Sequence, residues 1–226
     1  MKQPHDLLIH TQDLSRGYPG SPKLVFHKFN LGLYKHDFTI ITGVSGSGKS
    51  TLAKLILGQY RTPLKMIFHG HEDMARYSDN ELQLYRRRIG AIFQDYKLIP
   101  WKTVKENVIY PLTIMGQTPL NKITKLNRIL KTVGLQEQKD TIVKYLSGGE
   151  QQKVAIARAL IHDPEFIIAD EPTGNLDNDE KNKIADILIK LNELGHTILF
   201  ITHDTQLKKY IMKKVKATTV QLEKIA

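Results

Sequence analysis

A glycine-rich segment of the chain carries the residue types and the spacing of a phosphate-binding loop. In GVSGSGKST, residues Gly43, Gly48, Lys49 and Ser50 satisfy the pattern G-x-x-x-x-G-K-[ST]. Glycines let successive amides surround phosphate oxygens, the lysine adds charge at the β- and γ-phosphates, and the serine hydroxyl is a ligand for Mg²⁺. The expected nucleotide contacts of this loop are Gly43, Val44, Ser45, Gly46, Ser47, Gly48, Lys49, Ser50 and Thr51. The alternative, a plain glycine-rich turn, is disfavoured by the strand–loop–helix setting.

Two acidic residues follow a second apolar run. Asp170 and Glu171 come directly after residues 166–169. Because functional residues in a parallel sheet gather at the carboxyl ends of its strands, this pair is expected beside the phosphate loop. Asp170 suits the coordination of Mg²⁺, and Glu171 can polarise an attacking water. The alternative is that both residues merely begin a turn before Pro172.

A histidine follows a third apolar run. Residues 197–201 have the pattern of a strand, and His203 stands just past its end. A lone histidine is usually structural or exposed, but this one is expected at the same edge of the sheet as the acidic pair. We therefore predict that His203 contacts the γ-phosphate of the bound nucleotide.

The segment LSGGEQQ has the features of an anion-binding helix start. Ser147 and Glu150 match the S-x-x-E capping box, which predicts that a helix begins here. Gly148 and Gly149 leave bare amides at the positive end of that helix, where proteins often hold anions. No lysine or second glycine loop lies beside them to complete a phosphate site. The residue types alone leave open which anion this helix binds.

Strands and helices alternate in the order that these residues need. The run at 38–41 predicts a strand before the loop, and residues 51–57 predict a helix that ends at Gly58. Residues 179–194 predict another helix, ended by Gly195. The pattern indicates an α/β fold of the P-loop NTPase class, which leaves kinases, GTPases, helicases and transport ATPases open.

The composition is that of a globular protein of 226 residues, with 41% apolar and 25% charged residues. The net charge of +10 favours anionic partners such as nucleotides, nucleic acid or an anionic membrane face, with a solvated basic surface as the alternative. The absence of cysteine excludes disulfides and thiolate metal sites. No apolar run reaches the length of a membrane span, and the first residues lack the pattern of a signal peptide. We expect a soluble, cytoplasmic protein.

Five motifs in one order resemble the nucleotide-binding domain of ABC transporter ATPases. They are the phosphate loop, Gln94 in IFQDYKL, LSGGEQQ, IIADEPTGNLD and ITHD. The LSGG signature separates this family from other P-loop enzymes, and the resemblance covers nearly the whole chain. It implies one domain over residues 1–226. A RecA-like core with a β subdomain is expected at about 1–88 and 164–226, and a helical subdomain at about 89–163.

The resemblance also implies how ATP is held. In the family, two domains pack head to tail, and the signature helix of each copy faces the ATP bound by the other. Residues expected to act in trans are Ser147, Gly148, Gly149 and Glu150 of the signature and Asp177 of the D-loop. Tyr18 is similar to the aromatic that stacks on adenine, with a surface tyrosine as the alternative. The expected catalytic residues are Glu171 and His203, and the expected Mg²⁺ ligands are Ser50, Gln94 and Asp170.

Within the family, FQDYKLIPWKTVKENVIYPL is most similar to the FtsE group of cell-division ATPases, which work with the membrane protein FtsX. LSGGEQQ and ADEPTGNLD are shared with LolD/MacB-type ATPases of lipoprotein release and efflux, which remain the alternative. The resemblance implies an FtsX-like membrane partner that contacts the region between Gln94 and Trp101, and a position on the inner face of the cell membrane. The sequence departs from the pattern at Leu64 and Lys65, and its C-terminal residues lack the usual glycine hairpin.

The sequence disfavours three other classes of P-loop protein. A P-loop kinase would have a substrate lid in place of LSGGE. A chromosome-maintenance ATPase would carry a long coiled coil between Lys49 and Ser147, and a translation-type ABC protein would carry two cassettes. We expect no nucleic-acid partner, although the net charge keeps that reading open to test.

Overall fold

A five-stranded parallel sheet forms the centre of the computed structural model, which describes residues 6–17 and 23–225. Its strand order is β6-β7-β8-β3-β9. The strands are β3 (Phe38–Gly43), β6 (Ile89–Phe93), β7 (Phe166–Asp170), β8 (Thr197–Ile201) and β9 (Ala217–Leu222). All four neighbouring pairs are parallel, so their carboxyl ends meet at one edge. The loop after β3 and the polar residues after β7 and β8 are thereby brought together, as the sequence predicts.

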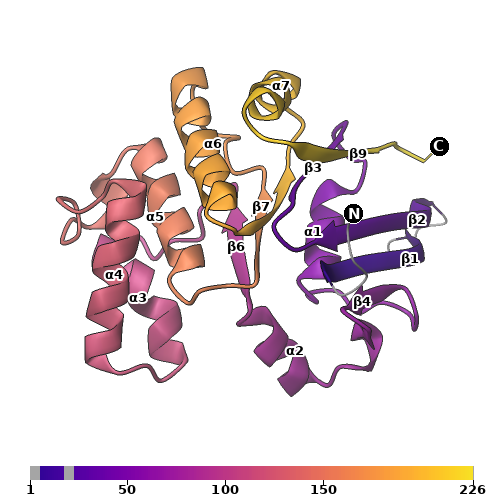
Figure 1. Ribbon diagram of the computed structural model, residues 1–226, viewed down its shortest axis with the longest axis horizontal. Coiled ribbons are helices and arrows are strands. Elements are labelled where there is room, and N and C mark those ends of the chain that lie inside the picture. The colour runs from indigo at the N-terminus through magenta and orange to yellow at the C-terminus, as the bar shows by residue number, and fades with distance from the viewer. Residues whose placement is uncertain (1–5, 18–22, 226) are drawn as a thin grey trace.

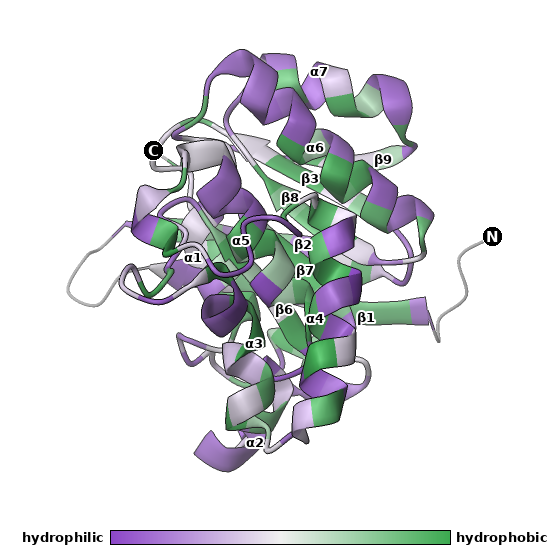
Figure 2. Ribbon diagram, turned by 90° about the vertical axis from the view of Figure 1, so that its left-hand side faces the viewer, coloured by the Kyte–Doolittle hydropathy of each residue, from purple (hydrophilic) through white to green (hydrophobic). Residues whose placement is uncertain are grey.

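Alternate residues of the strands serve two separate cores. Phe38 and Phe200 point to a cluster made with α3 (Val104–Ile114), α4 (Pro119–Val133), α5 (Gly148–Leu160), α6 (Asn178–Glu193) and α7 (Thr205–Lys214). Ile41 and Ile201 point to the other face, where α1 (Lys49–Ile56) and α2 (Asp79–Arg86) pack. Figure 2 shows hydrophobic residues along the inner strands and hydrophilic ones on the outer surface of α7. A strand that is buried on both faces has a continuous apolar sequence, and the core strands can therefore be predicted from the sequence.

A second, antiparallel sheet covers α1. Its order is β2-β1-β4-β5, with β1 (Leu7–Gly17), β2 (Leu24–Tyr34), β4 (Ile67–His69) and β5 (Glu72–Asp73). In Figure 1 this sheet lies at one end of the molecule, and α3, α4 and α5 lie together at the other end. Short 3₁₀ helices span Met74–Arg76 and Val143–Tyr145. In the segment HGHED, His69 ends β4, the next two residues form a turn, and Glu72–Asp73 is β5.

Three helices begin with the same capping box. Ser78 with Glu81 starts α2, Thr103 with Glu106 starts α3, and Ser147 with Glu150 starts α5. In each, the hydroxyl accepts a hydrogen bond from the third helical amide while the glutamate carboxylate accepts one from the capping amide. The predicted start of the signature helix is confirmed.

One boundary differs from the sequence-based expectation. Residues 89–93 were expected at the beginning of the helical segment but form β6, an edge strand of the central sheet. We therefore place the beginning of the helical segment after Phe93. The C-terminal residues, which lack a glycine hairpin, still form β9, which pairs in parallel with β3. Of the described residues, no helix combines the length and the apolar character that a membrane crossing requires.

Candidate nucleotide-binding site

The loop between β3 and α1 depends on a glycine immediately before the helix. Gly48 is the N-cap of α1 and has a left-handed conformation with φ of 95°. A Cβ atom here would lie 2.4 Å from Cγ1 of Val25 in β2. Both the dihedral angle and the close packing therefore exclude other residues. The result is a helix N-terminus whose amides face the loop.

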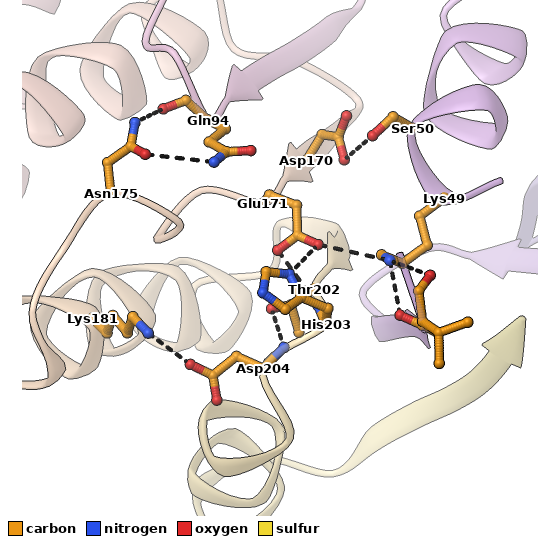
Figure 3. A network of polar contacts seen from close by, with 12 residues as sticks. Lys49, Ser50, Gln94, Asp170, Glu171, Asn175, Lys181, Thr202, His203 and Asp204 are labelled. Carbon is orange, nitrogen blue, oxygen red and sulfur yellow. Dashed lines mark hydrogen bonds and ion pairs between the residues drawn. The ribbon is translucent and has the colours of Figure 1, made fainter. Parts of the chain in front are cut away.

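The lysine of the loop is buried and reaches back over it. The Nζ atom of Lys49 donates hydrogen bonds to the carbonyl oxygens of Gly43, at 2.8 Å, and Val44, at 3.1 Å. It also lies 3.9 Å from Oε1 of Glu171. Figure 3 shows this amine between the loop and the carboxylate. A positive charge is thus held where phosphate oxygens would enter the loop.

Ser50 and Asp170 bring two oxygen atoms together from different elements. The Ser50 hydroxyl, on α1, donates to Oδ1 of Asp170, at the end of β7, over 3.3 Å. Burial raises the pKa of Asp170, and the neighbouring charge of Glu171 adds to this, whereas the hydrogen bond from Ser50 opposes it. A hydroxyl and a carboxylate oxygen held together in this way suit a hard cation such as Mg²⁺.

Glu171 stands in a backbone conformation that non-glycine residues rarely adopt. Its φ is 48°, and its amide donates to the carbonyl oxygen of Ile201 in β8 at 3.0 Å. The Glu171 carboxylate faces His203, whose Nδ1 lies 2.8 Å from Oε1. The His203 amide donates to Oε2 at 3.4 Å. Strained residues of this type collect at functional sites, where the surrounding structure holds them.

Gln94 is fixed by an asparagine from the loop after β7. The Asn175 side chain donates to the carbonyl oxygen of Gln94 at 3.1 Å, and the Gln94 amide reaches Oδ1 of Asn175 at 3.5 Å. Gly174 leaves room for this contact, because a Cβ atom there would lie 2.6 Å from Nε2 of Gln94. The end of β6 is therefore tied to the segment that leads into α6 (Figure 3).

Nine of the predicted nucleotide-binding and catalytic residues line one cavity of about 360 Å³. Its lining residues are Ser45, Gly46, Gly48, Lys49, Ser50, Thr51, Gln94, Glu171 and His203. Gly43 and Val44 contribute their carbonyl oxygens to Lys49, and Ser47 is buried within the loop. The predicted adenine contact, Tyr18, lies outside the described residues.

The signature residues do not line this cavity. Ser147, Gly148, Gly149 and Glu150 form the beginning of α5, where hydrogen bonds from the Ser147 amide and hydroxyl lower the pKa of Glu150. Gly149 packs against α6, because a Cβ atom there would lie 2.0 Å from Oε2 of Glu180. Asp177 is the N-cap of α6 and accepts a hydrogen bond from the Glu180 amide. On a single chain, the signature residues therefore lie apart from the cavity that Lys49 lines.

Two contacts at this site could not be read from the motifs. One is the pairing of Gln94 with Asn175, and the other is an ion pair of 2.9 Å between Lys181 and Asp204. Asp204 belongs to the ITHD motif, but its partner lies 23 positions away on another helix. Side chains four residues apart lie on the same face of a helix, so the sequence places Lys181 near Asp177. It does not indicate the contact of Lys181 with Asp204.

The geometry serves the transfer of a phosphoryl group to water. A lysine and a helix N-terminus face the cavity, a carboxylate and hydroxyl pair suits a cation, and Glu171 can orient a water molecule. The described residues contain no group of three or more histidine, cysteine, aspartate or glutamate side chains that could hold a metal unaided. The Ser50 and Asp170 oxygens suit a cation that shares its coordination with substrate phosphates.

Comparisons with known proteins identify relatives of the whole chain. Residues 26–174 match the family model described as ABC transporter. The chain is 40% identical over 200 residues to the cell division ATP-binding protein FtsE of Haemophilus influenzae, which covers 88% of this chain and 92% of that protein. It is 36% identical over 225 residues to the macrolide export ATP-binding/permease protein MacB of Marinobacter nauticus, covering 95% of this chain and 34% of that longer protein.

A solved structure has the same fold. It is the dimeric post-hydrolysis state of the ATP-binding cassette MJ0796 bound to ADP and Pi. The match has a TM-score of 0.81 at 30% sequence identity and covers 97% of each chain. The predicted α/β P-loop fold is confirmed.

Proposed function

The chain belongs to the ABC transporter family and is an ATPase of that family, and we propose that two copies close around two ATP molecules to drive a conformational change in a membrane partner. The observation that carries this proposal is the separation of the two half-sites. Lys49 lines the cavity, whereas the amides at the start of α5 stand elsewhere on the same molecule. A second copy, packed head to tail, supplies them.

The charges of the two halves explain why ATP would hold the copies together. Lys49 and the loop amides neutralise part of the triphosphate on one side. Ser147, Gly148 and Gly149 of the other copy add helix amides and a hydroxyl on the γ-phosphate side. Cleavage separates the γ-phosphate and adds repulsion between products, so the pair reopens. The post-hydrolysis dimer of MJ0796 supports such an arrangement.

Hydrolysis itself is assigned to the residues after β7 and β8. Glu171 orients the attacking water, and His203 steadies the transferring phosphoryl group while its Nδ1 is held by the Glu171 carboxylate. The strained backbone of Glu171 keeps its carboxylate directed at the loop. Loss of one such preorganised group costs on the order of 10²–10³ in rate.

The Mg²⁺ of the family fits the oxygens of Ser50 and Asp170. These atoms are 3.3 Å apart, and Gln94 lines the same cavity. When bound, the ion would supply positive charge to the β- and γ-phosphates. The positive charge of the ion would then offset the effect of burial and keep the Asp170 carboxylate ionised.

The membrane partner is proposed to dock beside the segment after β6. Trp101 is 72% exposed there, while Leu98 packs against the core and Tyr96 is half-buried. The Arg158 guanidinium holds the carbonyl oxygen of Tyr96 and lines an adjoining groove of about 320 Å³. The groove is lined by Arg86, Arg87, Ile89, Ala91, Phe93, Pro111, Ile114, Met115, Arg158, Ala159 and His162. An amphipathic segment of the partner would place its apolar side in this groove.

The similarity to FtsE favours a role in cell division with an FtsX-like subunit at the inner face of the membrane. The similarity to MacB keeps lipoprotein release or efflux, as in LolD/MacB-type proteins, as the second candidate. Affinity purification from membranes with identification of the bound permease distinguishes the two. A nucleic-acid partner is not expected, and stimulation of ATP turnover by a DNA duplex would overturn that expectation.

Mixed variants test the composite site. Lys49→Ala removes the loop charge. Gly148→Asp places a carboxylate in the first turn of α5, where it suits the helix dipole but repels phosphate. Each variant alone should be inactive, and a mixture should regain activity, because mixed dimers contain one site built from two intact halves.

The matched control mixes Lys49→Ala with Glu171→Gln. Both changes fall in the same half-site, so no mixed dimer has an intact site and no activity should return. Recovery in the control as well as in the test mixture, or in neither, would count against sites shared between two copies.

A further inference from the structure

An ion pair joins α6 and α7 directly behind the catalytic histidine. The Nζ atom of Lys181 lies 2.9 Å from Oδ2 of Asp204, and both side chains are largely buried. Figure 3 shows the pair beside His203 and below the Glu171 carboxylate. Neither residue lines the nucleotide cavity. The pair therefore cannot act by touching the nucleotide bound there.

Asp204 divides its two oxygens between two helices. Oδ1 caps α7 by accepting hydrogen bonds from the amides of Gln206, at 3.0 Å, and Leu207, at 2.9 Å. Oδ2 is left for Lys181. Burial disfavours the charge of Asp204, but the hydrogen bonds from Leu207, Lys181 and Gln206 outweigh it and lower its pKa. The Asp204 carboxylate therefore holds the backbone next to His203 in place.

The backbone on the other side of His203 is fixed as well. The hydroxyl of Thr202 accepts a hydrogen bond from the Asp204 amide at 3.0 Å. The amide of Thr202 donates to the carbonyl oxygen of Ile41 in β3, also at 3.0 Å. His203 itself is an exposed side chain, held by its 2.8 Å contact with Glu171. The position of the His203 backbone thus depends on the hydrogen bonds that Thr202 and Asp204 make.

Lys181 connects Asp204 to the loop that holds Gln94. Its amide donates to the carbonyl oxygen of Asp177 at 2.9 Å, in the first turn of α6. Asp177 caps that turn, and Asn175, two residues earlier, contacts Gln94. Residues 175–177 are therefore connected to Asp204 through Lys181 and its ion pair.

We propose that Lys181 is a positioning residue of the ATPase reaction, which acts through Asp204 to hold His203 against Glu171. The inference rests on the proposed function, because it takes His203 as a catalytic residue. It adds a path by which the segment at the expected dimer interface sets the geometry of the histidine. Misplacing a catalytic group in this way lowers kcat by about 10- to 100-fold without changing the binding of substrate.

The experiment compares Lys181→Met with Lys214→Met. Lys214 also joins the two helices, since its Nζ lies 2.7 Å from Oδ1 of Asp186, but it is on the last turn of α7. Lys181→Met should lower kcat while KM for ATP stays near that of the wild type. Lys181→Arg should restore most of kcat, and Lys214→Met should behave as the wild type does. Equal kcat values for the two methionine variants, or no recovery with arginine, would overturn the proposal.

A double-mutant cycle with His203→Ala separates the inference from its premise. If Lys181 acts through His203, Lys181→Met should cause no further loss of kcat in the His203→Ala background. A further full loss in that background would overturn the positioning role alone. A fully active His203→Ala variant would instead remove the premise that this histidine is catalytic.

Discussion

The Nδ1 atom of His203 and the Nζ atom of Lys49 approach the same oxygen of Glu171, at 2.8 Å and 3.9 Å. The three residues come from the ends of β7 and β8 and from the start of α1. One carboxylate oxygen thus links the residue that would orient water, the residue that would steady the phosphoryl group and the residue that would hold the phosphates. This convergence makes Glu171 the most informative position for mutation.

Glu171→Gln keeps the size of the side chain and its ability to accept a hydrogen bond from His203, but removes the charge that orients water. We expect ATP binding to persist and turnover to fall by about 10²–10³. A dimer should then accumulate with Mg-ATP, measurable by size-exclusion chromatography alongside phosphate release. A monomeric and fully active variant would refute the assignment of Glu171.

Ser147→Ala and Ser78→Ala remove the same local interaction from two different helices. Each serine is the N-cap of a capping box, so each variant should lose about 1 kcal/mol of unfolding free energy. Only Ser147→Ala should also lose ATP turnover, because only that hydroxyl is expected to face the nucleotide of a second copy. Chemical denaturation and turnover at saturating ATP check both expectations. Equal turnover in the two variants would show that Ser147 acts only as a helix cap.

Trp101→Ala tests the docking surface for the membrane partner. The side chain is 72% exposed, so its removal should leave stability and ATP affinity unchanged while partner association weakens. Leu120→Ala, a change of a 74% exposed residue on α4, is the matched control. The measurement is the amount of partner recovered by co-purification. Undiminished recovery with Trp101→Ala would exclude this side chain from the interface.

Stability should fall as the pH drops below about 6.5, the unfolded-state value for histidine. Burial lowers the pKa of His162, whose Nδ1 is buried with no hydrogen-bond partner among the described residues, so the unfolded chain binds a proton more readily than the folded chain does. Burial lowers the pKa of His10 and His196 in the same direction. Each group adds at most about 1.4 kcal/mol per pH unit, and only between its folded and unfolded pKa values.

His162→Gln isolates one part of this pH dependence. The unfolding free energy is measured by denaturant titration at about pH 7.5 and about pH 5.5, a window in which ordinary carboxylates stay ionised. The loss between the two values should be smaller in the variant than in the wild type. An unchanged or larger loss would show that His162 does not contribute.

The residues after the core strands could be predicted because the strands are buried on both faces. Runs such as 166–169 and 198–201 are apolar throughout, and parallel strands end at one edge, so the sequence predicts Asp170, Glu171 and His203 close together. The start of α5 could likewise be predicted, from its capping box. These features depend on short stretches of sequence and a simple rule of topology.

Other features depend on contacts that no local pattern encodes. β9 pairs with β3 although most of its residues are partly or fully exposed, so it lacks the apolar signal of the inner strands. α3 continues through Pro111, a residue that usually ends a helix. The Lys181–Asp204 ion pair joins two helices whose relative placement follows only from the complete fold.

The central claim is that one molecule holds only half of each ATP site, and the dependence of turnover on enzyme concentration tests it most directly. Specific activity is measured at saturating Mg-ATP over a dilution series that crosses the dissociation constant of the dimer. It should fall steeply at the dilute end and level off at high concentration. A specific activity that stays constant at every dilution, in a sample shown to be monomeric, would contradict the claim.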